Sequence, residues 1–386
     1  MAVEVSSSSI KLENGDSVDS APPAPSVSDD VYWSAQYLPV LSSLLKNAGS
    51  YTPEEQTSHL RFIESHVIPN IGPQPTSPDP VYVVSHFGSS TFEASINLND
   101  KGKPCVRFTF EPHGPLASNT AEGYPYKQVL DLSRAIQVDL GWFHKIASEF
   151  FILNGQDIAT VKTMMPPNLA RVPQYYVALD LNGGKRQMKV YFCPLIKQMV
   201  TGENSDEASF NVLNRLDPGF AAPLKAISDF RAESKEPLAI QMIGIDCVTP
   251  ETGARVKLYT RTESNTMDNV RDHVTLGGRR SDETTLKGLE VLGEIWHLLL
   301  DEPRGLADRS ISKPVNDPSN AWHTSIIYSW EVQPGKELPE VKVYVPLWQY
   351  SRSNKSIASN LEKVFKKQGW SWGTDGTYKR LLVDAL

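Results

Sequence analysis

The sequence predicts an α+β fold in which antiparallel β-hairpins alternate with helices. Four segments consist of an alternating strand, a turn rich in Gly, Asp, Asn or Pro, and a second alternating strand, which is the pattern of a β-hairpin. They are residues 92–112, 175–194, 239–261 and 325–346. Between the hairpins, apolar residues recur at helical spacing, as in residues 126–151, 211–234 and 285–301. The chain therefore repeats a unit of one hairpin and its helices.

The second strand of every predicted hairpin carries a basic residue. These cations are Arg107, Lys189, Arg255 with Lys257, and Lys342. In the last three hairpins a tyrosine follows a cation by two positions, and these tyrosines are Tyr191, Tyr259 and Tyr344. Because side chains two positions apart point to the same face of a strand, the cations and the phenol rings share one face.

The opposite face of the last three of these second strands is apolar. It comprises Val190, Phe192, Val256, Leu258, Val343 and Val345. This surface suits packing against helices, so a sheet that curls into an antiparallel β-barrel with helices outside would direct the cations into its lumen. The alternative is a sheet with one wet face, on which each Lys-x-Tyr pair is solvated.

Composition limits the class of protein. With 386 residues, 40% of them hydrophobic, the chain can bury the core of one large domain or two smaller ones. The net charge is -7 and no block of Lys and Arg is present, so nucleic acid is not an expected partner. Cys105, Cys193 and Cys247 form no CxxC pair, which predicts half-buried thiols rather than a zinc site or a disulfide framework.

The first 30 residues differ in composition from the rest of the chain. They are rich in Ser, Asp and Pro, which predicts a disordered tail over residues 1–30 before a domain over residues 31–386. They lack the basic start and apolar centre of a signal peptide, and the chain contains no run of about 18 apolar residues. We therefore expect a cytosolic protein with no membrane partner.

Cations enclosed in a lumen require an anion. Enclosed cations repel one another and lose hydration, which costs on the order of several kcal/mol per ion. A diphosphate can accept many charge-assisted hydrogen bonds, each worth about 1.5 to 3 kcal/mol. Aromatic faces stabilise a cation by about 2 kcal/mol when water is excluded. The pattern therefore predicts that diphosphate departs from an allylic group while the rings shield the carbocation.

A nucleotide or phosphosugar enzyme is the competing interpretation, and its motifs are missing. The sequence contains no GxGxxG, GxxxxGK[ST], HExxH or GxSxG motif. It also lacks a DDxxD-like carboxylate pair that would hold magnesium. We therefore expect protein cations to replace a metal, and we expect no cofactor.

Glu93 lies in the first strand of the first hairpin, among apolar and small residues. One interpretation is a strand carboxylate paired with a neighbour such as Arg107. The other is a carboxylate that accepts a hydrogen bond from the N–H or O–H of an aromatic acceptor, raises the electron density of its ring and receives a proton during the reaction.

Eight segments, in their order along the chain, resemble the fungal dimethylallyltryptophan synthase type of aromatic prenyltransferase. They are VYWSAQYLPVLSSLLKNAG, FIESHVIPNIGP, STFEASINL, VRFTFEP, KVYFCPLIK, RVKLYTR, VKVYVPLWQY and KKQGWSW. The resemblance runs from about Val31 to Leu386 and implies an αββα barrel of ten antiparallel strands within a ring of helices. It also implies metal-independent transfer of a dimethylallyl group from dimethylallyl diphosphate to an electron-rich aromatic ring.

The resemblance also implies roles for individual residues. The positions that look like the family's diphosphate ligands are Arg107, Lys189, Arg255 and Lys257, and Lys342 stands where relatives often have Gln. The positions that look like its tyrosine shield are Tyr191, Tyr259 and Tyr344. Glu93 falls on the family's acceptor-binding glutamate.

Three departures from the family pattern bear on the acceptor and on activity. Tyr176 stands where tryptophan-prenylating relatives tend to have Lys, and AIQMIGID lacks their Arg, which favours a larger indole or a phenolic polyketide of fungal secondary metabolism. A fifth hairpin is missing before Leu386, which leaves an open sheet edge. Either a second copy closes the edge in a homodimer, or the protein is a truncated, non-catalytic prenyl-diphosphate-binding homologue. A phosphate-binding regulator of other enzymes has no sequence feature in its favour.

Overall fold

The computed structural model describes residues 3–6, 27–72, 74, 92–98, 104–112, 126–164, 174–307, 311–318 and 326–385. They divide into two compact units. The N-terminal unit comprises residues 2–138, 152–189 and 384–386. The C-terminal unit comprises residues 139–151 and 190–383.

The sheet of the N-terminal unit is antiparallel and follows the order of the chain. Its strands are β1 (Val3–Ser6), β2 (Phe92–Leu98), β3 (Cys105–Phe110), β4 (Tyr175–Asn182) and the first part of β5 (Lys185–Phe192). Ser95 lies opposite Arg107, and Arg107 lies opposite Asp180. Strands β2 and β3 are neighbours in the sheet, as are β4 and β5, so the first two predicted hairpins are confirmed.

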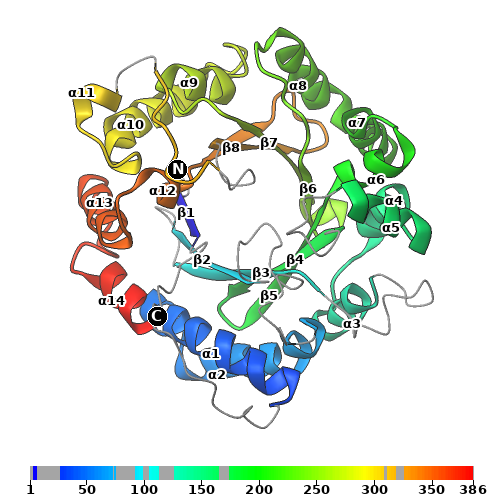
Figure 1. The fold of residues 1–386 in the computed structure, drawn as a ribbon, viewed down its shortest axis with the longest axis horizontal. Coiled ribbons are helices and arrows are strands. Elements are labelled where there is room, and N and C mark those ends of the chain that lie inside the picture. The colour runs from blue at the N-terminus through cyan, green and yellow to red at the C-terminus, as the bar shows by residue number, and fades with distance from the viewer. Residues whose placement is uncertain are drawn as a thin grey trace. The chain divides into compact units, whose positions relative to one another are not determined.

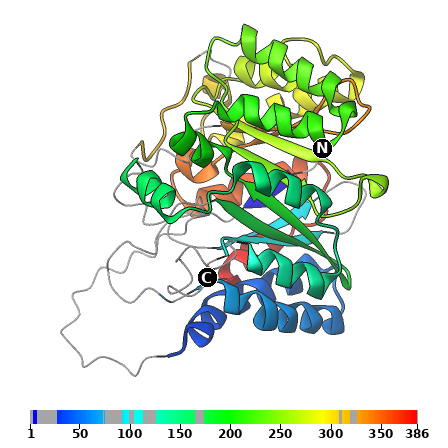
Figure 2. The same cartoon turned by 90° about the vertical axis from the view of Figure 1, so that its right-hand side faces the viewer.

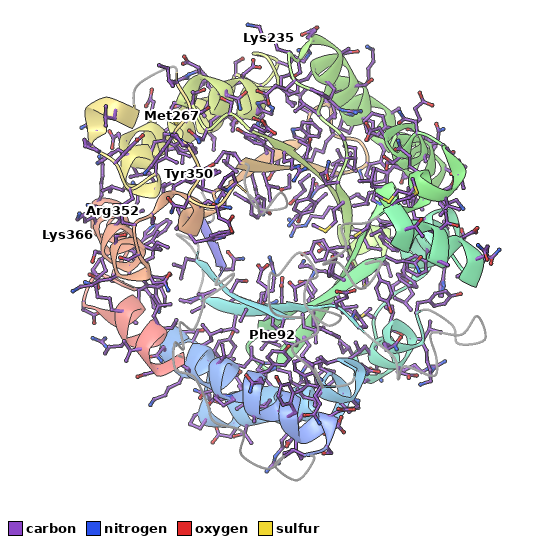
Figure 3. The ribbon with its side chains drawn as sticks, viewed as in Figure 1. Phe92, Lys235, Met267, Tyr350, Arg352 and Lys366 are labelled. Atoms are coloured by element: carbon purple, nitrogen blue, oxygen red, sulfur yellow. The ribbon has the colours of Figure 1, made fainter. Side chains whose placement is uncertain are left out.

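The N-terminal unit has its own helices, of which α1 (Asp29–Ala48) covers the apolar face of β2 and β3. The others are α2 (Pro53–His66), the short helix η1 (Ile68–Asn70), α3 (Lys127–Ile136) and α5 (Gly155–Met164). Helices α1 and α2 lie side by side, and α1 packs against β2 and β3 (Figures 1 and 2). Phe92 lies between β2 and α1 (Figure 3), where its ring stacks on Tyr37 with centroids 4.3 Å apart.

The C-terminal unit contains the other two predicted hairpins, which are also confirmed. Its strands are β6 (Met242–Asp246), β7 (Val256–Thr262), β8 (Ile326–Val332) and β9 (Glu340–Tyr344). Its helices are α4 (Gly141–Phe150), α6 (Pro194–Thr201), α7 (Ser205–Leu216), η4 (Pro218–Phe220), α8 (Ala221–Glu233), η5 (Pro250–Thr252), α9 (Met267–Thr275), α10 (Glu283–Leu299), α11 (Arg304–Ala307), α12 (Leu347–Tyr350), α13 (Asn354–Lys367) and all but the last two residues of α14 (Thr377–Ala385).

One face of the C-terminal sheet is apolar and packs against helices. Tyr328 is fully buried in a core cluster with Trp296 of α10 and Tyr350 of α12, and Val343 and Val345 pack against this cluster. Val256 and Leu258 are fully buried. The predicted apolar face is therefore confirmed at these valines and leucine, and the opposite face is left to the polar residues of the same strands.

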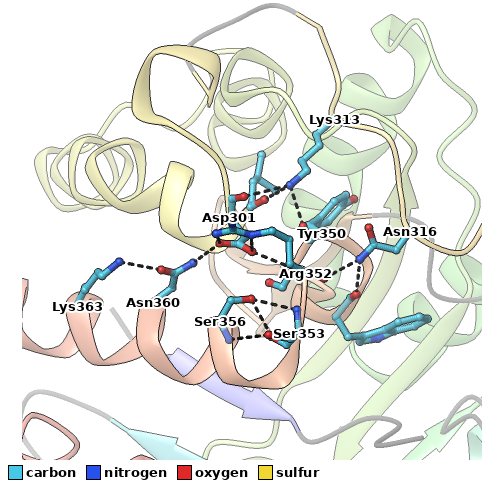
Figure 4. Close-up of polar contacts among 12 residues, drawn as sticks. Asp301, Lys313, Asn316, Tyr350, Arg352, Ser353, Ser356, Asn360 and Lys363 are labelled. Carbon is cyan, nitrogen blue, oxygen red and sulfur yellow. Dashed lines mark hydrogen bonds and ion pairs between the residues drawn. The ribbon is translucent and has the colours of Figure 1, made fainter. Parts of the chain in front are cut away.

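A polar brace holds α10, α12 and α13 together (Figure 4). The Lys313 ammonium donates to the backbone carbonyls of Leu300 and Tyr350, and the latter bond is 2.8 Å long. The Asp301 carboxylate accepts from Arg352 and from Asn360. The bonds to Arg352 and Asn360 hold the pKa of Asp301 below its usual range.

The expected tail over residues 1–30 and domain over residues 31–386 stay predictions. Val3–Ser6 forms β1, which pairs with β2, and residues 7–26 of the expected tail lie outside the described ranges. Helix α1 begins at Asp29, two residues before the predicted domain start. Because β1 pairs with β2, it satisfies backbone hydrogen bonds at that edge of β2. Within the described part of the chain, no helix is long and apolar enough to cross a membrane.

Candidate active site

The N-terminal unit holds a buried group of two cations and one carboxylate, Arg107, Lys189 and Asp180, which we call the N-terminal ionic group. Arg107 lies on β3 and donates through Nε and Nη2 to the two oxygens of Asp180 on β4, with the Nη2 bond 3.0 Å long. Lys189 Nζ lies 3.5 Å from Asp180 Oδ2. The structure therefore brings two of the predicted diphosphate ligands to one carboxylate, in a geometry typical of strong bidentate pairs.

Glu93 and Tyr176 share the face of this group. Glu93 lies opposite Thr109, two positions from Arg107 on β3, so both side chains point to the same face. Tyr176 is four positions before Asp180 on β4 and is also on that face, where it is buried. Glu93 is only half-buried. Two predicted acceptor-side residues thus lie on the face that carries the cations of this unit.

The C-terminal unit holds a larger group of three cations and two carboxylates, Arg255, Lys257, Lys342, Asp246 and Glu331, which we call the C-terminal ionic group. Arg255 donates to Asp246 Oδ2 and to Glu331 Oε1, at 2.8 Å in both bonds. Glu331 Oε2 lies 3.9 Å from Lys257 Nζ and 4.0 Å from Lys342 Nζ. The remaining three predicted diphosphate ligands are therefore gathered around one buried carboxylate.

The charge of Arg255 depends on its two acidic partners. Burial by itself would lower the pKa of its guanidinium, but Asp246 and Glu331 outweigh that effect and raise the pKa well above its ordinary value. The group contains three basic and two acidic side chains, and the N-terminal ionic group contains two basic and one acidic side chain. Counted over these named side chains, each group has one more basic than acidic side chain, which suits an anionic ligand.

The three predicted shield residues form a row of rings in the C-terminal unit, which we call the tyrosine row. The ring centroids of Tyr191 and Tyr259 lie 5.9 Å apart, and those of Tyr259 and Tyr344 also lie 5.9 Å apart. Gly244 on β6 makes room for the row, since a Cβ there would lie 2.8 Å from Tyr191 Cδ1 and 3.3 Å from Tyr259 Cε2. Tyr259 and Tyr344 alternate with Lys257 and Lys342, so rings and cations lie on one face.

Sequence reasoning missed the carboxylates that hold the cations. Asp180, Asp246 and Glu331 each lie in the first strand of a hairpin. Each is the one charged residue of its strand. Glu93 occupies the corresponding strand of the first hairpin. The signal that could have found them is therefore a repeat: one acid in every first strand and a cation in or beside every second strand. An acid in an otherwise apolar strand requires a cationic partner when it is buried.

The face of the C-terminal sheet that carries the cations and the tyrosine row can stabilise both a negative and a positive charge. Its cations can bind a phosphate anion through charge-assisted hydrogen bonds, and its row of rings can stabilise a positive charge. Among the residues described, no group of three or more His, Cys, Asp and Glu side chains is arranged to hold a metal ion. The expectation that the cations of both units meet around one chamber stays a prediction.

Comparison with known proteins identifies the family. The family model described as tryptophan dimethylallyltransferase matches residues 29–380. The chain is 37% identical over 374 residues to the indole diterpene prenyltransferase terF of Tolypocladium album, covering 92% of this chain and 85% of that protein. The range matched by the family model extends through both units and spans the positions of all the site residues named above.

Solved structures have the same fold. The crystal structure of AnaPT from Neosartorya fischeri matches with a TM-score of 0.76 and 24% identity, covering 93% of this chain and 85% of that one. NotF, in complex with brevianamide F and DMSPP, matches with a TM-score of 0.72 and 22% identity, covering 95% and 88%. The predicted αββα fold is confirmed by this likeness. The chain belongs to the tryptophan dimethylallyltransferase family and is an aromatic prenyltransferase, an enzyme that joins a prenyl donor to an aromatic acceptor.

Proposed function

We propose that the protein transfers a dimethylallyl group from dimethylallyl diphosphate to an aromatic carbon of an indole-containing acceptor, without a metal ion. The observation that carries the proposal is the common face of the C-terminal sheet, where Lys257 and Lys342 alternate with Tyr259 and Tyr344. A diphosphate and the allylic cation derived from it need these two kinds of side chain next to each other.

The cations bind the diphosphate of the donor. Lys257 is 6% exposed and Lys342 is 35% exposed, so one ammonium is shielded from water and the other reaches the edge of the buried region. Charge-assisted hydrogen bonds from such groups are worth about 1.5 to 3 kcal/mol each. Arg107 and Lys189 supply the same type of donor from the N-terminal unit. Protein cations thereby provide the charge that magnesium supplies in metal-dependent prenyl transfer.

In the reaction, the bond between the allylic carbon and the diphosphate oxygen breaks, and its electron pair leaves with the diphosphate. The cations stabilise this departing charge, and the tyrosine row stabilises the allylic carbocation and excludes water from it. An aromatic carbon of the acceptor then attacks the carbocation and forms a carbon–carbon bond. The proton on that carbon then passes to the departed diphosphate, which restores aromaticity, and any proton that Glu93 has taken from the ring nitrogen returns to it.

Glu93 acts on the acceptor. Its carboxylate accepts the indole N–H, raises the electron density of the ring and takes up a proton as the ring is alkylated. Tyr176, on the same face of the sheet, lines the acceptor pocket. The likeness to an indole diterpene prenyltransferase supports an indole-containing acceptor larger than tryptophan, in secondary metabolism.

The test is to incubate purified protein with dimethylallyl diphosphate and excess EDTA, together with a panel of indoles and hydroxyaromatics. We expect a product heavier by one dimethylallyl unit, detected by mass spectrometry, and release of diphosphate. Glu93→Gln should slow transfer by roughly 100-fold or more, since general base catalysis contributes about that factor. The matched control is Glu64→Gln on the exposed surface of α2, which should leave the rate unchanged.

Two outcomes would contradict the proposal. Transfer that requires added magnesium would exclude the role of the protein cations as the metal's replacement. Binding of dimethylallyl diphosphate without transfer to any member of the panel would favour a non-catalytic prenyl-diphosphate-binding protein.

A further inference from the structure

Glu331 is the centre of the C-terminal ionic group. Its side chain is 3% exposed and lies on β8, directly opposite Lys257 of β7 and Glu340 of β9. Its Oε1 accepts a hydrogen bond of 2.8 Å from Arg255. One carboxylate therefore contacts cations from both neighbouring strands.

The two oxygens of Glu331 are used differently. While Oε1 is hydrogen-bonded to a guanidinium, Oε2 is buried and accepts no hydrogen bond from the described residues. Oε2 lies instead 3.9 Å from Lys257 Nζ and 4.0 Å from Lys342 Nζ, which are ion-pair distances but not hydrogen-bond distances. The lysines are attracted to Glu331 without being bound to it by hydrogen bonds.

We propose that Glu331 is a positioning residue that competes with the diphosphate for Lys257 and Lys342 and so weakens the binding of the diphosphate product. This inference rests on the proposed function of the C-terminal ionic group. Glu331 does not touch the reacting atoms. It acts through the two lysines, and Arg255 holds it in place.

The physical basis is the balance of charge in a buried group. Without Glu331, the three cations of this group would keep Asp246 as the group's one other carboxylate, and their larger excess of positive charge would bind the diphosphate product more tightly. The Glu331 carboxylate repels the diphosphate and offers both ammonium groups an alternative partner when the anion leaves. Oε2 makes no hydrogen bond with the lysines. The lysines can therefore turn from Glu331 to the diphosphate without breaking a hydrogen bond to Glu331.

The test uses inorganic diphosphate as the probe and isothermal titration calorimetry of the full chain. We expect Glu331→Gln, which keeps the shape and the acceptor for Arg255 but removes the charge, to bind diphosphate about tenfold more tightly or better. Diphosphate should also inhibit prenyl transfer by this variant at correspondingly lower concentration. A merely structural residue would not produce tighter binding, because loss of support disorders the cations and weakens their ligand.

The matched control is Glu340→Gln on the adjacent strand. Glu340 lies opposite Glu331 but is exposed, so solvent screens its charge and the affinity for diphosphate should change less than about twofold. Glu331→Asp, which withdraws the carboxylate from the lysines, should tighten binding in the same direction by a smaller factor. This variant also carries the test if Glu331→Gln does not fold, as judged by circular dichroism.

Failure of this inference is distinguishable from failure of the proposed function. If Lys257→Ala weakens diphosphate binding but neither Glu331 variant tightens it, the competing role of Glu331 is wrong and the diphosphate site stands. If the wild-type protein does not bind diphosphate, or Lys257→Ala binds it as well as the wild type, the proposed site is wrong and the inference falls with it.

Discussion

In both ionic groups, carboxylates partly neutralise cations on one face of a sheet, but the geometry of the contacts differs. In the N-terminal group a single carboxylate, Asp180, receives a bidentate guanidinium and an ammonium 3.5 Å away, and all three side chains are buried. In the C-terminal group Glu331 hydrogen-bonds one cation and attracts two others from 3.9 and 4.0 Å. The carboxylate of the first group uses both oxygens to hydrogen-bond one guanidinium, whereas Glu331 uses one oxygen for a guanidinium and leaves the other to two ammonium groups at ion-pair distance.

From this difference we expect the N-terminal group to contribute more to stability and the C-terminal group more to ligand binding. A bidentate pair fixes the position of Arg107, which would then present a fixed donor to a ligand at little additional cost in side-chain entropy. The ammonium groups of Lys257 and Lys342 make no hydrogen bond to Glu331, so moving toward an incoming anion breaks no hydrogen bond to that carboxylate. We expect substitutions in the N-terminal group to affect stability most and those in the C-terminal group to affect ligand affinity most.

The largest effect is expected for Asp180→Asn. This change removes the carboxylate that two buried cations share, and breaking a buried pair in this way costs about 3 to 5 kcal/mol. Urea unfolding followed by circular dichroism measures the loss. The matched control is Asp131→Asn on α3, whose exposed pairs with Lys127 and Arg134 should contribute less than about 1 kcal/mol. Equal losses for the two variants would contradict the comparison.

The next effect concerns the affinity for diphosphate. Lys257→Ala removes a buried donor and should weaken binding by roughly 10- to 100-fold, which corresponds to about 1.5 to 3 kcal/mol. Lys342→Ala removes a donor that is 35% exposed and should weaken binding less. Calorimetric titration with a non-hydrolysable dimethylallyl thiodiphosphate gives both values. If Lys342→Ala weakened binding more than Lys257→Ala, the exposed fraction of a lysine would not predict its contribution to diphosphate affinity.

A smaller effect is expected in the tyrosine row. Gly244→Ala adds a methyl group 2.8 Å from Tyr191 Cδ1, so the ring has to move, at a cost of about 1 to 3 kcal/mol. Displacement of the ring exposes the carbocation to water. We expect a larger share of prenyl alcohol relative to alkylated acceptor, measured by chromatography of the products. An unchanged product ratio would mean that the row does not shield the carbocation.

The smallest effect is a pH dependence of stability that involves both units. Burial lowers the pKa of His59 in the N-terminal unit and of His273 in the C-terminal unit below 6.5. The unfolded chain therefore binds more protons below that pH, and stability falls as the pH is lowered from about 6.5 toward the folded pKa values. Each histidine contributes at most about 1.4 kcal/mol per pH unit.

Urea unfolding at about pH 7 and about pH 5.5 measures this dependence. His59→Gln and His273→Gln should each reduce the difference between the two pH values. If only one substitution does so, the titration of a single unit controls acid stability.

Much of the site could be predicted because its pattern is local. Lys257 and Tyr259, or Lys342 and Tyr344, share a face wherever a strand forms, since alternation is a property of the strand itself. The acids were harder to assign, because an acid in a strand does not identify its partner. Asp180 binds Arg107, 73 positions away, across the junction of two hairpins. Glu331 likewise contacts Arg255 and Lys257 of the preceding hairpin.

By itself the sequence determined the four hairpins, the helices between them and the face on which each cation and tyrosine lies, because these follow from periodicity within short segments. Only the tertiary structure decided which carboxylate neutralises which cation, that Gly244 admits the tyrosine row, and that Val3–Ser6 pairs with β2. The physical reason is that register between distant strands is set by contacts that no single segment contains.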